Sequence, residues 1–513
     1  MRHPERIVIL DFGSQTTQLI ARRLRELGVY CEILPFSADA ESVLTGETRG
    51  VILSGGPASV TESGSPRPDA RILESDRPLL GICYGMQVLG EHFGSRVVPG
   101  AQGEFGRASI SVRENGVLWK GLGGRLDVWI SHGDHIERVC QPLREIAASE
   151  DGIVSAIAHR ERPVYGVQFH PEVTHTLRGT DILRNFAFDV CGCRGGWSME
   201  SFIDQTISEL RRVLGKAKVL CAVSGGLDST VTAVLLGRAV GEQLISIHVD
   251  TGLGRKGERQ EIEQVFTEHE HIRLRVVDAS EEFFHNLAGV AEPEAKRKII
   301  GRTFIDVFQR EASRIEGVEF LAQGTLYPDV IESVSVRGPS ATIKSHHNVG
   351  GLPETLHLKL IEPLRELFKD EVREVGRLLN VPDSILYRHP FPGPGLAVRV
   401  LGEVTCERCD LLREADAIYT QELHRFGWYR KTRQAFVVLL PVKAVGVMGD
   451  QRTYENVCVL RAVDTDDFMT ADFSRLPFDL LARAASRIAN EVRGINRVTY
   501  DITSKPPATV EWE

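Results

Sequence analysis

The sequence predicts an α/β protein with two doubly wound, mostly parallel sheet domains and a smaller C-terminal α+β domain. Short runs of Val, Ile and Leu, each bounded by Gly, Pro or Ser, alternate with helical patterns along two separate stretches of the chain. A chain of 513 residues is also longer than one hydrophobic core usually organises. The pattern changes after residues 389–395, HPFPGPG, which hold three prolines and two glycines. We therefore expect domains at residues 1–190, 197–388 and 389–513.

The first domain begins with a strand and repeats the alternation of strand and helix. Its apolar runs are too short for buried helices, which indicates buried parallel strands. The strands are expected at residues 6–11, 29–34, 51–54, 78–83 and 164–170. The segment CGCRGGW at 191–197 has three glycines and no period, so it is predicted to be a linker.

The second domain repeats this organisation after a helical pattern that starts near Ile203. Its strands are expected at residues 218–223, 244–250, 273–279 and 319–324. Between the last two, residues 294–312 form an amphipathic pattern. Its apolar face holds Ile299, Ile300, Phe304, Val307 and Phe308. A second doubly wound sheet fits this order of elements.

The third domain has a different pattern. Alternating runs at 435–442 and 457–463 predict strands, and long helical patterns cover 406–426 and 477–492. This mixture indicates a smaller α+β domain.

The composition excludes several classes of protein. The chain has 61 Lys and Arg against 70 Asp and Glu, a net charge of −9, whereas binding to nucleic acid needs a clustered basic face. The longest apolar stretch, residues 435–448, is interrupted by Pro441 and Lys443, so neither a membrane-spanning helix nor a membrane partner is expected. Only residues 7–10 form an apolar run near the N-terminus, which is too short for a signal-peptide core, and a cytoplasmic location is predicted.

Nine cysteines, an odd number at low density, indicate reduced thiols. Cys406 and Cys409 form a C-x-x-C, but the sequence has no second pair of this kind, so no zinc site is expected. Cys83 differs because it lies between Gly81 and Gly85 where an apolar strand meets a helical pattern. This is the arrangement of a nucleophile elbow with sulfur in place of oxygen. The start of the helix favours a thiolate, so Cys83 is predicted to be a nucleophile.

Two further segments supply partners for this thiol. His170 and Glu172 are two residues apart at the end of another predicted strand, so both side chains leave it on the same side. They suit a base and the acid that orients it. Residues 54–57, SGGP, follow a third strand and offer closely spaced backbone amides that suit an oxyanion hole. The sequence therefore predicts a Cys-His-Glu triad.

Four motifs in order resemble class I glutamine amidotransferases: SGGP at 54–57, GICYGMQ at 81–87, SHGD at 131–134 and FHPE at 169–172. The resemblance implies that Cys83 attacks the carboxamide of glutamine, that His170 relays protons, and that Glu172 orients His170. It implies that ammonia is the product and that the amides of Gly56 and Tyr84 hold the oxyanion. The implied oxyanion-binding and glutamine-binding residues are Gly55, Gly56, Tyr84, Gln87, Ser131, His132, Gly133 and Asp134.

A glycine-rich loop, SGGLDST at 224–230, follows the strand that ends at Val223 and opens a helix. Its glycines let the backbone approach a phosphate, and the helix N-terminus favours negative charge. Its hydroxyls can donate to phosphate oxygens, and the Gly-Lys-Ser/Thr of a Walker loop is absent. A carboxylate beside a polyphosphate needs a cation between them, so Asp228 is predicted to meet Mg²⁺.

This loop resembles the PP-loop of N-type ATP pyrophosphatases, which cleave ATP to AMP and pyrophosphate. Position 227 is Leu where members of that family often have Val. The resemblance implies Mg²⁺ with ATP and no tightly bound organic cofactor. It implies that Val249 and Phe304 flank the adenine and that Lys344 and Lys369 meet phosphates. The implied ATP-binding residues are Ser224, Gly225, Gly226, Leu227, Asp228, Ser229, Thr230, Val249, Phe304, Lys344 and Lys369.

Segments spread over the chain resemble glutamine-hydrolysing GMP synthetases. They are residues 294–301, 343–348, 389–396, 449–452 and 501–513. The resemblance implies that ATP adenylylates xanthosine monophosphate (XMP) and that ammonia from glutamine displaces the adenylate, giving GMP, AMP and pyrophosphate. It also implies a homodimer through the third domain. The implied XMP-binding residues are Arg297, Asp450, Gln451, Lys505 and Glu511.

Two other functions stay open from the residues alone. A different PP-loop amidotransferase could act on another nucleotide or on a tRNA base, although the negative net charge disfavours tRNA. A chain that only senses nucleotide is the second alternative. The complete set of Cys83, His170, Glu172 and Asp228 disfavours it.

Overall fold

The structure of the chain, a computed structural model, describes residues 3–268, 272–334, 358–448, 451–465, 468 and 470–513. They form two compact units. The N-terminal unit consists mainly of residues up to 205, and the C-terminal unit holds most of the residues from 206 on. The predicted boundaries at 190, 197 and 388 stay predictions.

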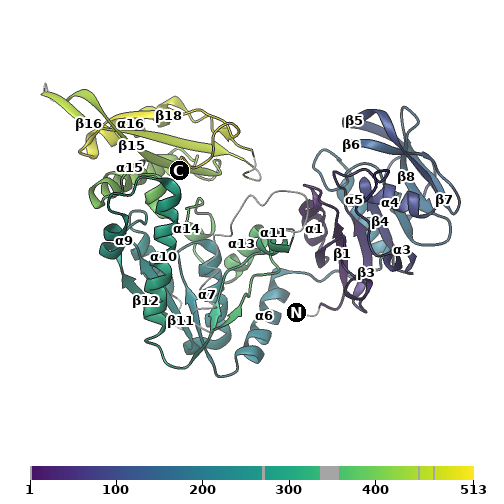
Figure 1. The fold of residues 1–513 in the computed structure, drawn as a ribbon, viewed down its shortest axis with the longest axis horizontal. Helices are drawn as coiled ribbons and strands as arrows, with labels where there is room; N and C mark the ends of the chain where they lie inside the picture. The colour runs from purple at the N-terminus through teal and green to yellow at the C-terminus, as the bar shows by residue number, and fades with distance from the viewer. Residues whose placement is uncertain (1–2, 269–271, 335–357, 449–450, 466–467, 469) are drawn as a thin grey trace. The chain divides into compact units, whose positions relative to one another are not determined.

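A nine-stranded sheet in the order β2-β1-β3-β4-β9-β8-β7-β5-β6 is the centre of the N-terminal unit (Figure 1). Five strands pair in parallel, as the apolar runs predict. They are β1 (Arg6–Asp11), β2 (Cys31–Pro35), β3 (Thr48–Leu53), β4 (Leu79–Ile82) and β9 (Val164–Val167). An antiparallel half that is not among the predicted elements completes the sheet. It consists of β5 (Arg96–Val112), β6 (Arg125–Arg138), β7 (Leu143–Ser149) and β8 (Val154–His159).

Helices connect the parallel strands and bury their apolar faces. Val8, Leu10 and Val51 of the sheet pack with Tyr84 and Val88 of α4 in one hydrophobic cluster. Because β1, β3, β4 and β9 run parallel, their carboxyl ends meet at one edge of the sheet. The helical elements are α1 (Thr17–Glu26), α2 (Ala40–Val43), α3 (Ala70–Glu74), α4 (Tyr84–His92), η1 (Val117–Trp119), α5 (Gly179–Arg184) and η2 (Asn185–Val190), and α6 (Met199–Leu214) follows the predicted linker.

The C-terminal unit contains a parallel sheet in the order β12-β11-β10-β13-β14. Its first four strands are those predicted from the sequence, and β14 is an addition. The bounds are β10 (Lys218–Ala222), β11 (Leu244–Asp250), β12 (Arg273–Asp278), β13 (Val318–Ala322) and β14 (Lys359–Ile361). The helices around it are α7 (Leu227–Val240), η3 (Gly241–Gln243), α8 (Glu258–Glu268), α9 (Ser280–Leu287), α10 (Pro293–Ala312), α13 (Lys369–Leu378), α14 (Asp383–Leu386) and η5 (Gly395–Val398). From Pro328 on, α11 (Tyr327–Val334) belongs to the N-terminal unit.

The last part of this unit is a mostly antiparallel sheet with two helices, as predicted. Its elements are α15 (Cys406–Arg425), β15 (Gln434–Met448), β16 (Gln451–Asp464), β17 (Asp472–Phe473), α16 (Phe478–Glu491) and β18 (Ile495–Asp501). One hydrophobic cluster joins it to the parallel sheet, since Leu220 and Phe308 belong to the same core as Leu412, Val437 and Ala484. The predicted fold class, α/β with large parallel-rich sheets and a smaller C-terminal α+β part, is confirmed.

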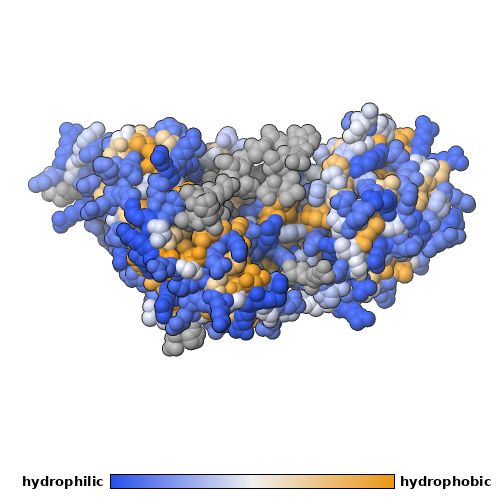
Figure 2. Space-filling model, turned by 60° about the horizontal axis from the view of Figure 1, so that its bottom comes forward, coloured by the Kyte–Doolittle hydropathy of each residue, from blue (hydrophilic) through white to orange (hydrophobic). Residues whose placement is uncertain are grey.

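The face drawn in Figure 2 is largely hydrophilic, with apolar residues gathered in smaller patches. Within the described ranges, no helix has the length and apolar character that crossing a bilayer requires.

Candidate active sites

Cys83 lies at the sharp turn between β4 and α4. Its backbone has φ 52° and ψ −107°, a left-handed conformation that residues with a side chain rarely adopt. The turn needs glycine on both sides, because a Cβ at Gly81 would lie 2.5 Å from the carbonyl carbon of Gly85. A Cβ at Gly85 would in turn collide with the carbonyl of Leu53. The predicted strand-to-helix elbow is therefore confirmed.

His170 and Glu172 form a buried pair beside this thiol. His170 Nδ1 lies 2.7 Å from Glu172 Oε1, and the Glu172 side chain is fully buried. Both residues lie beyond β9, which ends at Val167, three residues earlier than predicted. Burial would lower the pKa of His170, but its hydrogen bonds to Cys83 and Glu172 outweigh burial and raise that pKa to about 10. His170 is therefore an imidazolium at pH 7 that contacts both the Cys83 sulfur and the Glu172 carboxyl group.

Thr16 is a member of this cluster that the sequence analysis does not name. Its Oγ1 donates a 2.6 Å hydrogen bond to Glu172 Oε1, the oxygen that also meets His170. Thr16 follows β1, whose carboxyl end lies at the same sheet edge as the elbow. The signal in the sequence that could have indicated Thr16 is the segment after β1, which contains the hydroxyl residues Ser14, Thr16 and Thr17.

The SGGP loop lies directly against the catalytic pair. A Cβ at Gly55 would lie 3.1 Å from His170 Cε1 and 3.7 Å from Cys83 Cβ, so only glycine leaves this space free. A Cβ at Gly56 would lie 2.7 Å from the carbonyl oxygen of Phe12. Tyr84 is the first residue of α4, so its amide has no acceptor within the helix. This arrangement suits the oxyanion role predicted for the Gly56 and Tyr84 amides.

The SHGD motif lies on β6 and borders the sulfur. Cys83 Sγ is 3.6 Å from the carbonyl oxygen of Ser131. Asp134 receives a hydrogen bond from Ser59, and open space surrounds Gly133. His132 is buried, and burial, followed by the charge of the neighbouring histidine at position 135, lowers the pKa of His132 to about 4. His132 is therefore neutral at pH 7.

Two buried glutamines lie behind the thiol. Gln87 Nε2 donates to the carbonyl oxygen of Asp134 at 2.8 Å and lies 3.5 Å from Gln168 Oε1. Gln168 Nε2 lies 3.8 Å from Cys83 Sγ. Gln87, predicted to bind glutamine, is thus part of the wall of the site, and Gln168 is a second neighbour of the sulfur that the sequence analysis does not name.

The C-terminal unit contains a cavity of about 1120 Å³ at the carboxyl ends of β10 and β11. The cavity is lined by most of the predicted ATP-binding set, namely Ser224, Gly225, Gly226, Leu227, Asp228, Val249, Phe304 and Lys369. Within the part of the chain that the structure describes, the lining of the cavity does not include Ser229 or Thr230, and Thr230 is only 1% exposed. Lys344 lies outside the described residues.

The loop at 224–230 has the conformation of an anion-binding turn. Ser224 Oγ lies 3.1 Å from Ser229 Oγ, and Ser229 Oγ also accepts from the Ser224 amide at 3.2 Å. Gly225 has φ 78°, and a Cβ there would lie 2.5 Å from Ile262 Cδ1. The helix α7 begins immediately after Gly226. The helix therefore directs its free amides towards the cavity.

Asp228 and Lys369 form an ion pair in this cavity. Lys369 Nζ lies 2.7 and 2.6 Å from the two carboxylate oxygens of Asp228. Lys369 is the first residue of α13, so the contact joins two segments that are 141 residues apart. A carboxylate and an ammonium at the loop suit a metal ion and a phosphate respectively.

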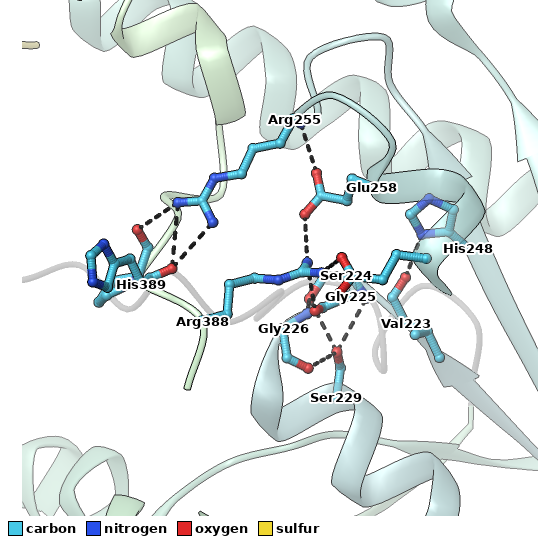
Figure 3. Close-up of polar contacts among 12 residues, drawn as sticks. Val223, Ser224, Gly225, Gly226, Ser229, His248, Arg255, Glu258, Arg388 and His389 are labelled. Atoms are coloured by element: carbon cyan, nitrogen blue, oxygen red, sulfur yellow. Dashed lines mark hydrogen bonds and ion pairs between the residues drawn. The ribbon is translucent and has the colours of Figure 1, made fainter. Parts of the chain in front are cut away.

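Two arginines that the sequence alone does not indicate lie near the loop: Arg388 contacts it directly, and Arg255 is linked to Arg388 through Glu258 (Figure 3). Arg388 Nη1 donates to the carbonyl oxygen of Gly225 at 3.1 Å and to Glu258 Oε1 at 2.9 Å. The backbone amide of Arg255 donates to Glu258 Oε2 at 3.0 Å, and the Arg255 guanidinium donates to the carbonyl oxygen of His389. These contacts connect the HPFPGPG segment to the glycine-rich loop.

Three of the residues predicted to bind XMP, Arg297, Lys505 and Glu511, already have partners within the chain. Arg297 donates to the main-chain oxygen of Glu513 at 2.5 Å, and Lys505 Nζ donates to the carbonyl oxygen of residue 468 at 2.6 Å. Glu511 accepts from Arg399 at 2.8 and 3.1 Å and from the side chain of residue 434. Asp450 lies outside the described residues.

The structure does not bring Gln451 close to Lys505 within one chain. Gln451 begins β16, whereas Lys505 bridges to Ala471, close to where β16 ends at Asp464. A strand of 14 residues is about 40 Å long at the usual rise per residue. Within one chain, Gln451 and Lys505 therefore belong to opposite ends of the sheet.

Two protein families match parts of this chain. Residues 8–190 match the family described as glutamine amidotransferase class-I. Residues 421–512 match the family described as GMP synthase C terminal domain.

Curated proteins match almost the whole chain. A protein of Fusobacterium nucleatum subsp. nucleatum named GMP synthase (glutamine-hydrolyzing) is 54% identical over 508 residues, which cover 99% of each chain. Proteins with the same name from Bartonella quintana and Aquifex aeolicus are 56% identical over 514 residues and 55% identical over 507 residues. These matches cover 100% and 99% of this chain and 99% of each relative.

Proposed function

Because this chain belongs to the family of glutamine-hydrolysing GMP synthases, we propose that its two units divide the reaction between them. The chain is a glutamine amidotransferase of the ligase type and uses ATP. We assign ammonia production to the site around Cys83 and GMP formation to the cavity at loop 224–230. The elbow thiol beside the His170–Glu172 pair is the observation that carries the first assignment.

In the glutaminase half, the sulfur of Cys83 attacks the amide carbon of glutamine. The amides of Gly56 and Tyr84 hold the oxyanion, and His170 transfers its proton to the departing nitrogen, which leaves as ammonia. The resulting thioester is hydrolysed by water, which His170 deprotonates, and glutamate leaves. Glu172 keeps the imidazole oriented through the contact at Nδ1.

In the synthetase half, the C2 oxygen of XMP attacks the α-phosphorus of ATP and pyrophosphate leaves. Ammonia then attacks C2 and displaces AMP, which gives GMP. The amides of the glycine-rich loop and the Lys369 ammonium bind phosphate oxygens, and Val249 and Phe304 contact the adenine. The carboxylate oxygens of Asp228 line the cavity and are the ligands that Mg²⁺ prefers, so Asp228 would hold the ion that neutralises the polyphosphate.

We assign the XMP site to Arg297, Lys505 and Glu511 in one copy, together with Gln451 from a second copy. The distance along β16 separates Gln451 from the others within a chain. The hairpin that carries Gln451 also exposes Val445, Val447 and Tyr454, at 50%, 75% and 66% of their surface. Val445 pairs directly with Tyr454 in the hairpin, and Val447 is two residues away on the same face. An apolar face of this kind suits the interface of a homodimer.

The reaction is tested with XMP, ATP and Mg²⁺, supplied with either glutamine or ammonium. Pyrophosphate release that depends on XMP, with GMP as product, is the expected result. The Cys83→Ala variant should lose activity with glutamine and keep it with ammonium. Pyrophosphate release with another nucleotide and none with XMP would contradict the proposal, and so would a folded Cys83→Ala variant that fails with both nitrogen sources.

The homodimer is tested by sedimentation velocity at micromolar concentration. The full chain is expected to sediment as a dimer, and Val447→Asp is expected to shift it towards monomer. Val117→Asp, at an exposed valine of the N-terminal unit, is the matched control. A monomeric wild type with full activity would contradict the assignment of Gln451 to a second copy.

A further inference from the structure

Gln168 is a buried amide that contacts the sulfur of Cys83. Its side chain is 1% exposed, and its Nε2 lies 3.8 Å from Sγ, within the range of a hydrogen bond to sulfur. A buried polar group of this kind needs a partner, because an unpaired donor loses its bonds to water. The thiol sulfur is therefore a partner that the amide requires, and the reaction scheme above does not use this contact.

The surrounding groups determine which end of the Gln168 amide faces the sulfur. Gln87 Nε2 donates to the carbonyl oxygen of Asp134 at 2.8 Å and directs a second hydrogen towards Gln168 Oε1 at 3.5 Å. Because Gln168 Oε1 accepts from Gln87, the NH₂ end is the one that faces Cys83. The Gln168 main chain is fixed as well, since its amide donates to the carbonyl oxygen of Ser155 at 2.9 Å.

The groups around the sulfur have opposing effects on a thiolate. The Ser131 carbonyl oxygen at 3.6 Å can accept from a thiol and disfavours a negative sulfur. His170 is charged and donates to the sulfur, which favours a negative sulfur. The carboxyl groups of Glu172, which contacts His170, and of Asp134, on the same strand as Ser131, have the opposite effect. His132 is neutral at pH 7 and adds no charge. Gln168 adds a donor that keeps its hydrogen throughout the reaction. His170, in contrast, gives its proton to the nitrogen that leaves as ammonia.

We propose that Gln168 is a catalytic residue of the glutaminase and that its amide donates to the Cys83 sulfur and favours the thiolate. This inference rests on the proposed role of Cys83 as nucleophile. It assigns Gln87 as a positioning residue, because Gln87 contacts Gln168 and not the sulfur.

The test is the rate at which iodoacetamide alkylates Cys83 in the full chain, followed by mass spectrometry of the Cys83 peptide. Gln168→Met keeps the length of the side chain and removes the donor. The variant is expected to react about tenfold more slowly at pH 7, the size expected for loss of one hydrogen bond to a charged group. Raising the pH should restore its rate, because the thiolate then forms without the amide.

Gln168→Glu is the second variant and places a carboxylate against the sulfur. It is expected to slow alkylation at pH 7 more than the methionine variant does, because like charges disfavour the thiolate. Cys406 is an exposed thiol on α15 and serves as the internal control in the same digest. Its rate should be equal in all three proteins.

Equal Cys83 alkylation rates in wild type and either variant would overturn the role of Gln168. Thermal unfolding of the full chain followed by circular dichroism, together with elution as a single species in size-exclusion chromatography, shows whether each variant is folded, and a folded Gln168→Glu decides the question if Gln168→Met is not folded. Failure of the proposed function is a separate result, because glutaminase activity in Cys83→Ala would overturn the nucleophile itself.

Discussion

At the scale of single residues, Glu172 depends on Thr16 as well as on His170. The Thr16 hydroxyl and the imidazole meet the same carboxylate oxygen, at 2.6 and 2.7 Å. Hydrogen bonds to charged groups contribute about 1.5–3 kcal/mol. Thr16→Val should therefore lower glutaminase activity about tenfold and leave GMP formation with ammonium unchanged. Steady-state assays with both nitrogen sources check this, with the exposed Thr61→Val as control. Equal losses with both nitrogen sources would show a general folding defect.

The buried His389 should make the free energy of unfolding fall as the pH is lowered. Burial lowers the pKa of His389 to about 4, and the neutral ring is held between Tyr429 and Ala435 by bonds at Nε2 (2.7 Å) and Nδ1 (3.1 Å). The unfolded chain binds this proton near pH 6.5 and the folded chain only near pH 4. The stabilisation is therefore complete above pH 6.5 and is lost as the pH falls towards 4, by about 3 kcal/mol at most.

Urea unfolding at pH 7.5 and 4.5 measures this loss. His389→Phe keeps a ring that can stack on Tyr429, which lies 3.9 Å from the histidine ring. The variant is expected to be less stable than the wild type at pH 7.5 but to lose less stability on acidification. The number of protons taken up on unfolding, obtained from the slope of the unfolding free energy against pH, should be smaller by up to one. The same pH dependence in both proteins would contradict the assignment.

At the scale of elements, α10 fixes the C-terminal segment through a buried charge. Lys296 is 0% exposed, and its Nζ contacts the Glu513 carboxylate and the carbonyl oxygens of Ala397 and Val400 at 3.2 and 2.8 Å. Removing one partner of a buried pair leaves the other charge uncompensated, which typically costs about 3–5 kcal/mol. Lys296→Met should destabilise the chain by about 3 kcal/mol.

A double variant separates this charge effect from packing. Lys296→Met combined with Glu513→Gln removes both charges and should recover most of the lost stability. Lys298→Met is the control on the same helix, because Lys298 is 75% exposed and lies 4.0 Å from its acidic partner. Urea unfolding midpoints of the wild type, Lys296→Met, Glu513→Gln, the double variant and Lys298→Met provide the measurement, and a loss in the double variant equal to the sum of the two single losses would contradict the coupling.

Elements differ in how clearly the sequence shows them. Parallel strands such as β1 and β11 are predicted to the residue, because most of their residues are apolar and buried and Gly or Pro lies near each end. The antiparallel half is not predicted, since β5 contains Pro99 and several glycines that argue against a strand. β6 alternates instead, with Leu126, Val128 and Ile130 buried, and this period-two signal is the one that could have revealed it.

At the scale of the whole molecule, strand order decides which site residues can be found from sequence. Cys83, His170 and Asp228 are predictable because each chemical group lies at the end of its own strand or loop. The hydroxyl-rich segment around Thr16 is visible in the sequence, but the contacts of Thr16 and Arg388 are not, because they depend on which strands are neighbours and which distant segments return to the loop. The family resemblance implies one XMP site that contains both Gln451 and Lys505, while the register of β16 separates them within one chain.

Because the two sites lie in separate compact units, we expect that glutamine hydrolysis and XMP-dependent pyrophosphate release can be lost independently. Asp228→Asn removes the carboxylate beside the glycine-rich loop and leaves Lys369 without its partner. Asp228 would hold the Mg²⁺ that neutralises the reacting phosphates, so its loss should lower XMP-dependent pyrophosphate release by about two orders of magnitude. Glutamine hydrolysis without nucleotide should stay within about twofold of wild type, because Cys83 and His170 belong to the other compact unit.

Parallel assays of pyrophosphate and glutamate check both halves, with the exposed Asp306→Asn on α10 as control. A matching fall in glutamate release would show instead that hydrolysis at Cys83 requires an intact Asp228.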